Sequence, residues 1–555
     1  MAKGYRRVDR DQPFLLPPDM REWLPADHPV WLVIRVVGDH LDTSAFHAGR
    51  RTGGAGTAGY DPDMLVTVLM WAYANGLTSS RRIEAACWAD VAFRVICAGH
   101  APDHVTIARF RAAFPGAVED LFTGVVVLCA KLGMGKLGTI ALDSTKITAN
   151  ASRAANRGEE TLRKLAAEQA AKAMAAHAAA DAAEDERYGE GRRGDEVPPE
   201  AVNPAARAAR IAAALAELEA ERAAEQEAKE AQRQQRLEAA EAGTPVTGRP
   251  PAAARVALAA QRAARARAAQ RAKIADWQRR NAGRAAAGQP PLPGPGPKPV
   301  QACARVAAAR ARLARAQAAQ EEAERKAAQE PDPVRNITDP DSRLMPVRGG
   351  AFIQGYNAQN VTSEDGLIIA EELTNDTSDG PWFEPMLAAA QKAAALITAH
   401  RPPPATTPDD QGSDDQGGGI GQVLADTGYC SAHNLTCAGP DRLIATSKHR
   451  TLEKTARQAA ASPGPASGED ALDGPIAAMT ARLATPEGIA AYRRRGHIAE
   501  TPHGQIKHNM RFRQLSMRGK PSAAAEWTFT CAVHNLLKAI TTGHLTSQAL
   551  ASLAS

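Results

Sequence analysis

The chain has 555 residues, which is too long for one compact domain and predicts roughly three or four folded units. Its net charge is only +5, from 67 Lys and Arg against 62 Asp and Glu, so any surface for a polyanion must be local. The seven cysteines show no Cys-x-x-Cys spacing, which predicts reduced thiols and a soluble, cytoplasmic protein. The longest early apolar run, residues 30–37, is short and contains Arg35, so we expect no membrane span.

The first part of the chain, residues 13–125, is predicted to be helical. Pro62 begins an apolar stretch at helical spacing that ends at Gly76, Ser79 is a candidate N-cap, and a third helix begins near Asp103. Short helices with tight turns and exposed Ser and Arg are typical of a helix-turn-helix-type DNA-binding domain, although other helical bundles give a similar pattern. The candidate DNA contacts in this part are Ser80, Arg81, Arg82, Arg109 and Arg111.

A short apolar run within residues 135–152 ends in Asp143, which predicts a buried strand that brings a carboxylate to a sheet edge. Residues 153–330, which follow, are rich in Ala, Arg, Glu and Gln and almost free of aromatic residues. Two long runs of helix-forming residues, 205–240 and 304–328, alternate with Pro/Gly-rich hinges. We therefore expect an antiparallel helical or coiled-coil insertion here.

Strands return in the last part of the chain, residues 335–545. Residues 352–362 and 367–373 flank a turn that contains Gly366, which predicts a β-hairpin. A further apolar run, residues 422–426, ends in a second carboxylate, Asp426. Two stretches rich in Pro, Gly and Ser are expected to be flexible inserts, near 401–419 and 456–485.

A basic block forms the third notable segment. Residues 492–520 contain eight Lys or Arg but a single acid, Glu500, and this imbalance favours phosphate contact over an ordinary solvated helix face. Gly504 would allow a DNA backbone to approach closely. The candidate DNA contacts in this block are Tyr492, Arg494, Arg495, Lys507, Arg511, Arg513 and Arg518.

Asp143, Asp426 and Glu500 are hard oxygen ligands suited to Mg²⁺ or Mn²⁺. If they converge, they can hold two ions per site, an arrangement that promotes in-line displacement at a phosphodiester. Taken singly, each acid has a simpler interpretation as a turn residue, a helix cap or half of an ion pair. Four other acids lie in predicted turns and are interpreted as loop residues: Asp339, Asp341, Asp376 and Asp379.

In their order along the chain these segments resemble a DDE transposase of bacterial insertion sequences, in the group with a Tyr–Arg–Glu–Lys signature. The resemblance rests on Leu142-Asp143-Ser144, Gly355-Tyr356-Asn357, Ala425-Asp426-Thr427-Gly428-Tyr429, Tyr492 to Arg495, Glu500, Gly504 to Lys507, and His534-Asn535-Leu536. It implies a mixed α+β chain, with an N-terminal helical DNA-binding domain and a ribonuclease-H-like catalytic domain that the Ala-rich segment interrupts. It also implies metal-dependent DNA cleavage and strand transfer at terminal inverted repeats, by a homodimer on double-stranded DNA of the element ends and the target.

The chain departs from that family pattern in two ways. Asp143 and Asp426 are 283 positions apart (426 − 143), and Arg495 precedes Glu500 by five positions rather than four, so several arginines are candidates for the signature position. The spacing from Glu500 to Lys507 fits. Two other functions stay open: a ribonuclease-H-like nuclease without strand transfer, and a catalytically inactive DNA-binding derivative.

Overall fold

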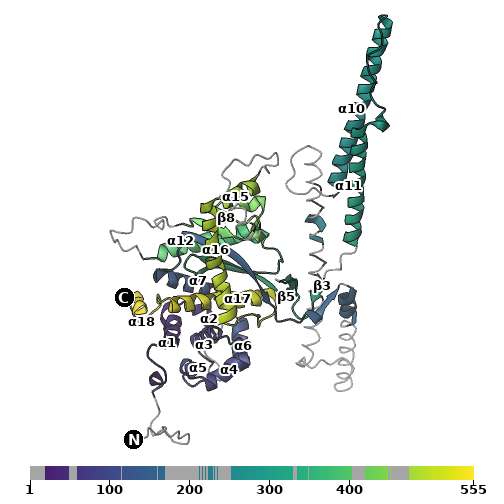
Figure 1. Ribbon diagram of the computed structural model, residues 1–555. Helices are drawn as coiled ribbons and strands as arrows, with labels where there is room; N and C mark the ends of the chain where they lie inside the picture. Colours follow the sequence, from purple (N-terminus) through teal and green to yellow (C-terminus); the bar gives the residue numbers. More distant parts are fainter. Residues whose placement is uncertain are drawn as a thin grey trace, which may run out of the picture. The chain divides into compact units, whose positions relative to one another are not determined.

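The computed structural model describes residues 19–48, 59–113, 115–158, 160–168, 252–328, 334–347, 349–402, 419–447 and 474–554, with single positions between 212 and 234 and at 451. The chain divides into two compact units, Met1–Asn156 with Asn336–Ser555, and Arg157–Arg335 (Figure 1). Most of the predicted helical run 205–240, residues 403–418 of one predicted insert and residues 456–473 of the other lie outside the described residues. Each unit is considered by itself below.

Helices make up the first part of unit 1, as the sequence predicts. They are α1 (Pro29–Arg35), α2 (Ser44–His47), α3 (Pro62–Ala74), α4 (Ser80–Ala89), α5 (Val91–Ile96), α6 (His104–Ala113) and α7 (Pro115–Lys131), with 3-10 helix η1 (Met20–Glu22) and π-helix η2 (Val36–His40). The side chain of Asp61 caps α3, with Pro62 at the first helical position. Ser79 occupies the N-cap position of α4, but its side chain makes no capping hydrogen bond. Asp103 accepts hydrogen bonds from the backbone N–H groups of Val105 and Thr106 at the start of α6.

A six-stranded mixed sheet forms the centre of unit 1. Its strands are β1 (Thr139–Thr148), β4 (Arg343–Pro346), β5 (Phe352–Ser363), β6 (Ile368–Thr374), β7 (Gln422–Ala425) and β8 (Asp441–Ile444). The order is β4-β5-β1-β7-β8, and β6 also pairs with β5. β1 is antiparallel to β5 and parallel to β7, and β7 is parallel to β8. The predicted hairpin is therefore confirmed as β5–β6, with Gly366 at φ +85° in its turn.

Four further helices pack around this sheet, together with shorter helical segments. They are α12 (Phe383–His400), α15 (Pro475–Leu483), α16 (Pro486–Gly504) and α17 (Lys520–Thr541); the shorter ones are η6 (Gly380–Trp382), η8 (Thr427–Tyr429), α13 (Ala432–Thr436), η9 (Gln505–Asn509, a π-helix) and α18 (Ser547–Ala554). α16 crosses the sheet and contacts β1, β5 and β7, while α17 packs against α7 and β6 (Figure 1). The chain is thus of a mixed helix-and-sheet class, compatible with the α+β prediction.

The alternation of side chains along β1 determines which face carries the first acid. Ala141 and Leu424 belong to a small apolar cluster with residues of α15 and α16. Ile140 and Leu142, by contrast, belong to the larger core that includes α12. Because side chains in a strand alternate with a period of two, Asp143 projects to the same face as Ala141, toward α16.

Residues 475–483 correct part of the sequence prediction. This stretch lies within the predicted flexible insert 456–485, but it forms helix α15 with Pro475 at its start. Met479 and Leu483, one helical turn apart, are buried against the sheet. Arg482 Nη1 also donates to Asp441 Oδ1 of β8 at 2.6 Å. Two apolar anchors and an ion pair are enough to order a short helix next to a chain segment of low hydrophobicity.

A buried hydrogen-bond network, called here the Glu526 network, joins distant parts of unit 1. Glu526 of α17 accepts from Tyr73 Oη of α3 at 2.6 Å and from the backbone N–H groups of Ser516 and Met517 at 2.8 and 3.0 Å. Arg111 of α6 donates to Tyr73 Oη at 3.0 Å. Glu526 is 2% exposed, so these donors supply the hydrogen bonds that water cannot. The network ties the N-terminal helices to α17 and to the segment before it.

The pH dependence of stability should report on a second acid, Glu371 of β6, which is half-buried. Thr528 donates to Glu371 Oε1 at 2.7 Å, and burial raises the pKa of this carboxyl to about 8 from 4.5. Its contribution to stability is therefore full below pH 4.5 and is lost as the pH rises through about 8. We expect the free energy of unfolding of the wild type, measured by urea titration, to fall over this range and that of Glu371→Gln to fall less. The two decreases should differ by a few kcal/mol, on the order of 1.4 kcal/mol per pKa unit. Equal pH profiles for the two proteins would contradict this prediction.

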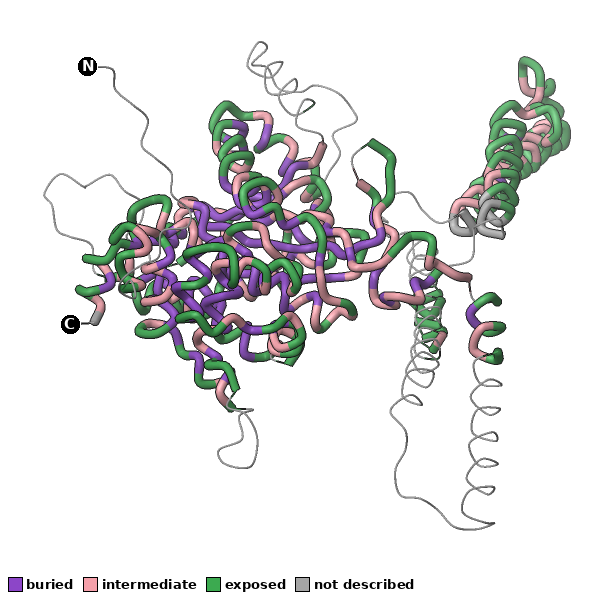
Figure 2. Tube along the Cα trace, turned by 90° about the horizontal axis from the view of Figure 1, so that it is seen from below, coloured by how far each residue is buried: buried purple, intermediate pink, exposed green. Residues whose placement is uncertain are grey.

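Unit 2 consists mainly of a helical hairpin, α10 (Ala252–Ala286) and α11 (Ala304–Ala328), so the helix predicted at 304–328 is confirmed. Gln270 donates to the backbone oxygen of Lys298 at 2.6 Å, and the ring of Trp277 packs closely on Gly296 in the connection. Most of the hairpin's described surface is exposed (Figure 2) because alanine side chains bury little area. The remaining elements of the described chain are two short paired strands and two 3-10 helices. They are β2 (Asn156–Gly158), β3 (Val334–Asn336), η3 (Arg153–Ala155) and η5 (Val300–Ala302).

No single helix in the described ranges is long and apolar enough to cross a membrane; only the bent pair α6 and α7, taken together, has the required length and composition.

Candidate active site

Two of the predicted acids lie side by side where β7 ends, next to the middle of β1, which continues to Thr148. Leu142 pairs with Ala425 in the parallel register, so the next residue on each strand is an aspartate, Asp143 and Asp426. The side chain of Asp143 is 14% exposed and that of Asp426 is 40% exposed. Asp426 also caps η8 by accepting from the N–H of Gly428 at 2.8 Å. Strand register alone thus brings together two carboxylates that are far apart in the sequence.

Helix α16 adds an arginine and the third predicted acid. Arg495 Nη2 donates to Asp143 Oδ1 at 2.8 Å and lies 3.9 Å from Asp426 Oδ2, so this guanidinium sits between the two aspartates. Glu500 is exposed on the same helix, close enough for its charge to raise the pKa of Asp143. The structure therefore places Asp143 and Asp426 next to each other and Glu500 within electrostatic range of Asp143, although the ligand atoms of the three acids do not all lie within 4.8 Å of one another.

The electrostatics of this place favour a bound cation. Burial raises the pKa of Asp143, Arg495 lowers it, and the charges of Glu500 and Asp379 raise it again, with a net upward shift. Burial likewise raises the pKa of Asp426, and Asp143 and Asp379 add to that effect against Arg495. Carboxylates whose ionised forms repel each other in this way gain from a divalent cation, so the donor set fits Mg²⁺ or Mn²⁺.

A fourth carboxylate, Asp379, lies beside the site. The sequence predicts only a loop residue at this position. Its Oδ1 accepts hydrogen bonds from four side chains on β1 and β5: Asn357 at 2.7 Å, Ser144 at 2.8 Å, Gln359 at 3.1 Å and Lys146 at 3.3 Å. A Cβ added at Gly428 would lie 2.9 Å from Asp379 Oδ2 and 3.0 Å from Asp426 Oδ1, so a larger residue there would displace these carboxylates. Burial raises the pKa of Asp379, but its donors outweigh burial and lower the pKa overall. The signal in the sequence was the set of polar residues at alternate positions of two buried strands.

Besides Arg495, two residues of the basic block point inward rather than to solvent. Lys507 lies in η9 and donates to Thr145 Oγ1 and, at 3.0 Å, to the backbone oxygen of Lys146 on β1. Tyr492 is 5% exposed, and burial raises its pKa to about 12. In this structure Lys507 therefore fastens the end of α16 to the strand that carries Asp143.

The remaining basic residues of this block are more exposed. Arg494 forms an ion pair with Glu364, Arg513 donates to the backbone oxygen of Lys507, and Arg518 donates to that of Asn150. Arg511 is exposed and adopts φ +53°. Nothing lies within 4 Å of a Cβ built at Gly504, so the helix surface is open there.

A polar groove of about 650 Å³ separates the starts of α4 and α6 from the segment that follows β1 and from residues 514–516. It is lined by Thr78, Ser79, Ser80, Arg81, His104, Val105, Ala108, Arg109, Arg111, Asn150, Gln514, Leu515 and Ser516. Arg81 and Arg109 are exposed, as is Arg82 next to the groove, whereas Arg111 donates to Tyr73 Oη, the Thr78 backbone oxygen and Ser80 Oγ. Predicted DNA contacts from the N-terminal helices thus share this groove with residues that continue from β1.

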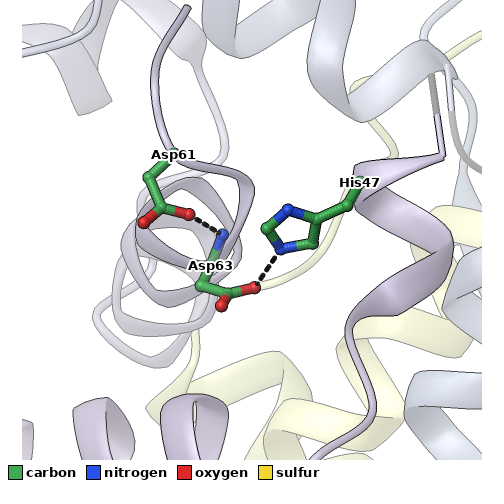
Figure 3. A group of neighbouring side chains, drawn as sticks. All are labelled: His47, Asp61 and Asp63. Carbon is green, nitrogen blue, oxygen red and sulfur yellow. Dashed lines mark hydrogen bonds and ion pairs between the residues drawn. The ribbon is translucent and has the colours of Figure 1, made fainter. Parts of the chain in front are cut away.

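A separate group of possible metal ligands, His47, Asp61 and Asp63, lies at the start of α3 (Figure 3). Sequence reasoning did not single it out. Asp61 Oδ1 accepts from the N–H of Asp63 at 2.9 Å as a helix cap, and His47 Nε2 lies 2.9 Å from Asp63 Oδ1. Helix capping and this ion pair explain the cluster without an ion.

Comparison with known families adds two matches to this geometry. Residues 18–113, which end before α7, match a transposase domain (DUF772), and residues 469–540, which include α16 and α17, match a transposase DDE domain. Neither curated proteins nor solved structures give a significant match. The first match gives the class of the protein, which is a transposase and hence a DNA-acting enzyme. The second match narrows this class to the DDE transposases, a family that generally uses divalent metal ions.

Proposed function

We propose that this transposase cuts DNA at the terminal inverted repeats of an insertion sequence and joins the ends to a target, with Asp143, Asp426 and Glu500 as its catalytic acids. One observation carries the proposal: the parallel register that sets Asp143 beside Asp426 beneath α16, the helix that bears Glu500. The strand order supports it. An antiparallel hairpin on one side of β1 and two parallel strands on the other correspond to a ribonuclease-H-like catalytic domain.

In this proposal Asp143, Asp426 and Glu500 hold two Mg²⁺ or Mn²⁺ ions. Such ions activate a water or a 3′-hydroxyl and stabilise the leaving oxygen of a phosphodiester. The chain itself orients the acids: Asp379 fixes the ends of β1 and β5 through its donors, and Lys507 fastens α16 to β1. We assign Arg495 to the arginine position of the Tyr–Arg–Glu–Lys signature, with Tyr492, because it is the arginine that contacts Asp143.

We further propose that the polar groove holds the DNA backbone near the cleaved bond. Asn150 lines the groove and follows Asp143 by seven residues, so an extended chain between them spans at most roughly 23 Å. That distance corresponds to about seven base pairs of DNA. The phosphate contacts in the groove come from Ser80, Arg81, Arg82 and Arg109. Along α16 and beyond, they come from Arg494, Arg511, Arg513 and Arg518. Arg111 positions the groove wall through its hydrogen bonds. Two copies of the chain hold the two ends as a homodimer on DNA.

Removing groove arginines should weaken DNA binding and its dependence on salt. For the double variant Arg81→Gln/Arg109→Gln we expect a lower affinity for end DNA, and a plot of log K against log salt concentration less steep by about one unit per lost phosphate contact. Fluorescence anisotropy over a salt series measures both quantities. The matched control is Arg94→Gln, an exposed α5 arginine that instead lies over the ring of Trp23, 5.1 Å from its centroid. An unchanged salt slope in the double variant, or an equal change in the control, would contradict the assignment.

The function is tested with linear DNA that carries the flanking inverted repeats, a target plasmid and Mg²⁺ or Mn²⁺. Cation-dependent cuts at the repeat ends, together with joined products in the target, are the expected result. Cuts without any joined product would instead indicate a nuclease without strand transfer. Binding of the repeats without cuts would indicate an inactive DNA-binding derivative.

A further inference from the structure

His503 near the end of α16 is buried next to the proposed catalytic acids without a visible role. Its side chain is 10% exposed, and neither ring nitrogen has a hydrogen-bond partner among the described residues. The nearest acidic atom is Asp143 Oδ2, 4.0 Å from His503 Nε2. The charges of Lys507 and Arg495 also face the ring, and His534 of α17 lies close enough to interact with it.

An imidazole in this position calls for a partner. A buried polar group left without a hydrogen bond costs on the order of 1–3 kcal/mol, so native proteins rarely retain one without a reason. A separation of 4.0 Å is too long for a hydrogen bond between His503 and Asp143. Two atoms that bind one ion, each at about 2.1 Å, can be up to about 4.2 Å apart. The observed separation therefore suits two ligands of a shared ion without movement of the backbone.

Glu500 lies on the same helix, three residues before His503. Residues at this spacing lie on one face of a helix, and a glutamate and a histidine so placed serve together as ligands in helical carboxylate metal sites. The ligand atoms of Asp143, Glu500 and His503 do not all lie within 4.8 Å of one another in this structure, so the pair that carries the argument is His503 with Asp143, from two elements that are in contact.

We propose that His503 supplies a nitrogen ligand to one of the cation positions of the catalytic site, alongside Asp143. The proposal rests on the proposed function, which requires a cation at the catalytic acids. Imidazole is a good ligand for transition metals, whereas Mg²⁺ prefers oxygen. The histidine thus makes this position selective for Mn²⁺ or a similar transition metal over Mg²⁺.

Pulsed electron paramagnetic resonance of Mn²⁺ bound to the full chain, without DNA, tests the assignment. We expect ¹⁴N coupling to the manganese in the wild type and its loss in both His503→Gln and His503→Phe. The matched control is His497→Gln, which removes a histidine three residues before Glu500 on the exposed side of α16 and should retain the coupling. Circular dichroism and thermal melts establish that each variant is folded, and the wild-type spectrum is informative even if neither His503 variant folds.

Affinity measurements give a second readout. We expect the His503 variants to bind Mn²⁺ at least about tenfold more weakly and Mg²⁺ less than about threefold more weakly. Mn²⁺ bound with no nitrogen coupling in the wild type would overturn the assignment and leave the carboxylate site intact, with a water bridging His503 and Asp143. Coupling that survives in both His503 variants, or disappears in the His497 control, would overturn it too. An Asp143→Asn chain that binds Mn²⁺ with unchanged affinity would instead overturn the proposed function.

Discussion

Asp143→Asn should reduce cleavage at the element ends by about 10³-fold or more, because it removes a charged ligand of the ions that drive the displacement. The amide preserves the shape of the side chain, so DNA binding should stay within about twofold of wild type. The substitution also removes the closest ion-pair partner of Arg495, so thermal melts without metal must establish that the variant is folded. Single-turnover cleavage and thermal melts measure these effects.

Asp426→Asn and Glu500→Gln should show the same separation of binding from cleavage. The matched control is Asp276→Asn, an exposed α10 aspartate paired with neighbouring arginines, which should cleave as wild type does. If any of the three acid variants cleaves at the wild-type rate, that acid does not belong to the catalytic set. Wild-type rates in all three would mean that the chemistry lies elsewhere.

Arg495→Gln should make the stability of the protein depend on divalent cations. Arg495 and Asp143 are 13% and 14% exposed, and their contact at 2.8 Å is the closest ion pair that either makes. Removing one partner of a buried pair leaves an uncompensated charge, which typically costs about 3–5 kcal/mol. We therefore expect a melting temperature several degrees lower in chelator, and a larger increase on adding Mn²⁺ than in the wild type.

The neighbouring residue provides the control for this experiment. Arg494 pairs with Glu364 at the surface, where both side chains are more than a third exposed, and such pairs contribute about 0–1 kcal/mol. Arg494→Gln should therefore melt close to wild type with or without Mn²⁺. A similar loss of stability in both variants, or none in Arg495→Gln, would show that Arg495 does not compensate the charges of the site.

Much of the site was predictable because its parts depend on local rules. An apolar run that ends in an acid identified both aspartates, although only Asp426 directly follows its strand and β1 continues five residues beyond Asp143. The turn at Gly366 likewise predicted the pairing of β5 with β6. Asp379 was not predictable in this way, since its role depends on four donors that become neighbours only when β1 and β5 pair. The surroundings of His503 and Lys507 likewise depend on how α16 crosses the sheet and changes to a π-helix at its end.

The less predictable parts of the fold have a similar cause. Residues 475–483 look like linker by composition, and only the apolar surface beside β8 makes them a helix. Runs rich in alanine predict helix for 304–328 directly, because alanine has the highest helix propensity. Composition does not predict how α10 and α11 turn back on each other, which depends on contacts such as Trp277 with Gly296.

The Glu526 network has a consequence for how this protein is made. Tyr73 and Glu526 are 453 positions apart, so the first helices leave the ribosome long before their buried partner has been synthesised. At about 5–20 residues per second that wait lasts on the order of half a minute or more, during which the surfaces that α17 covers are bare. A chain that ends before Glu526 cannot complete unit 1. Shortened copies of the gene should therefore produce chains that chaperones and proteases remove.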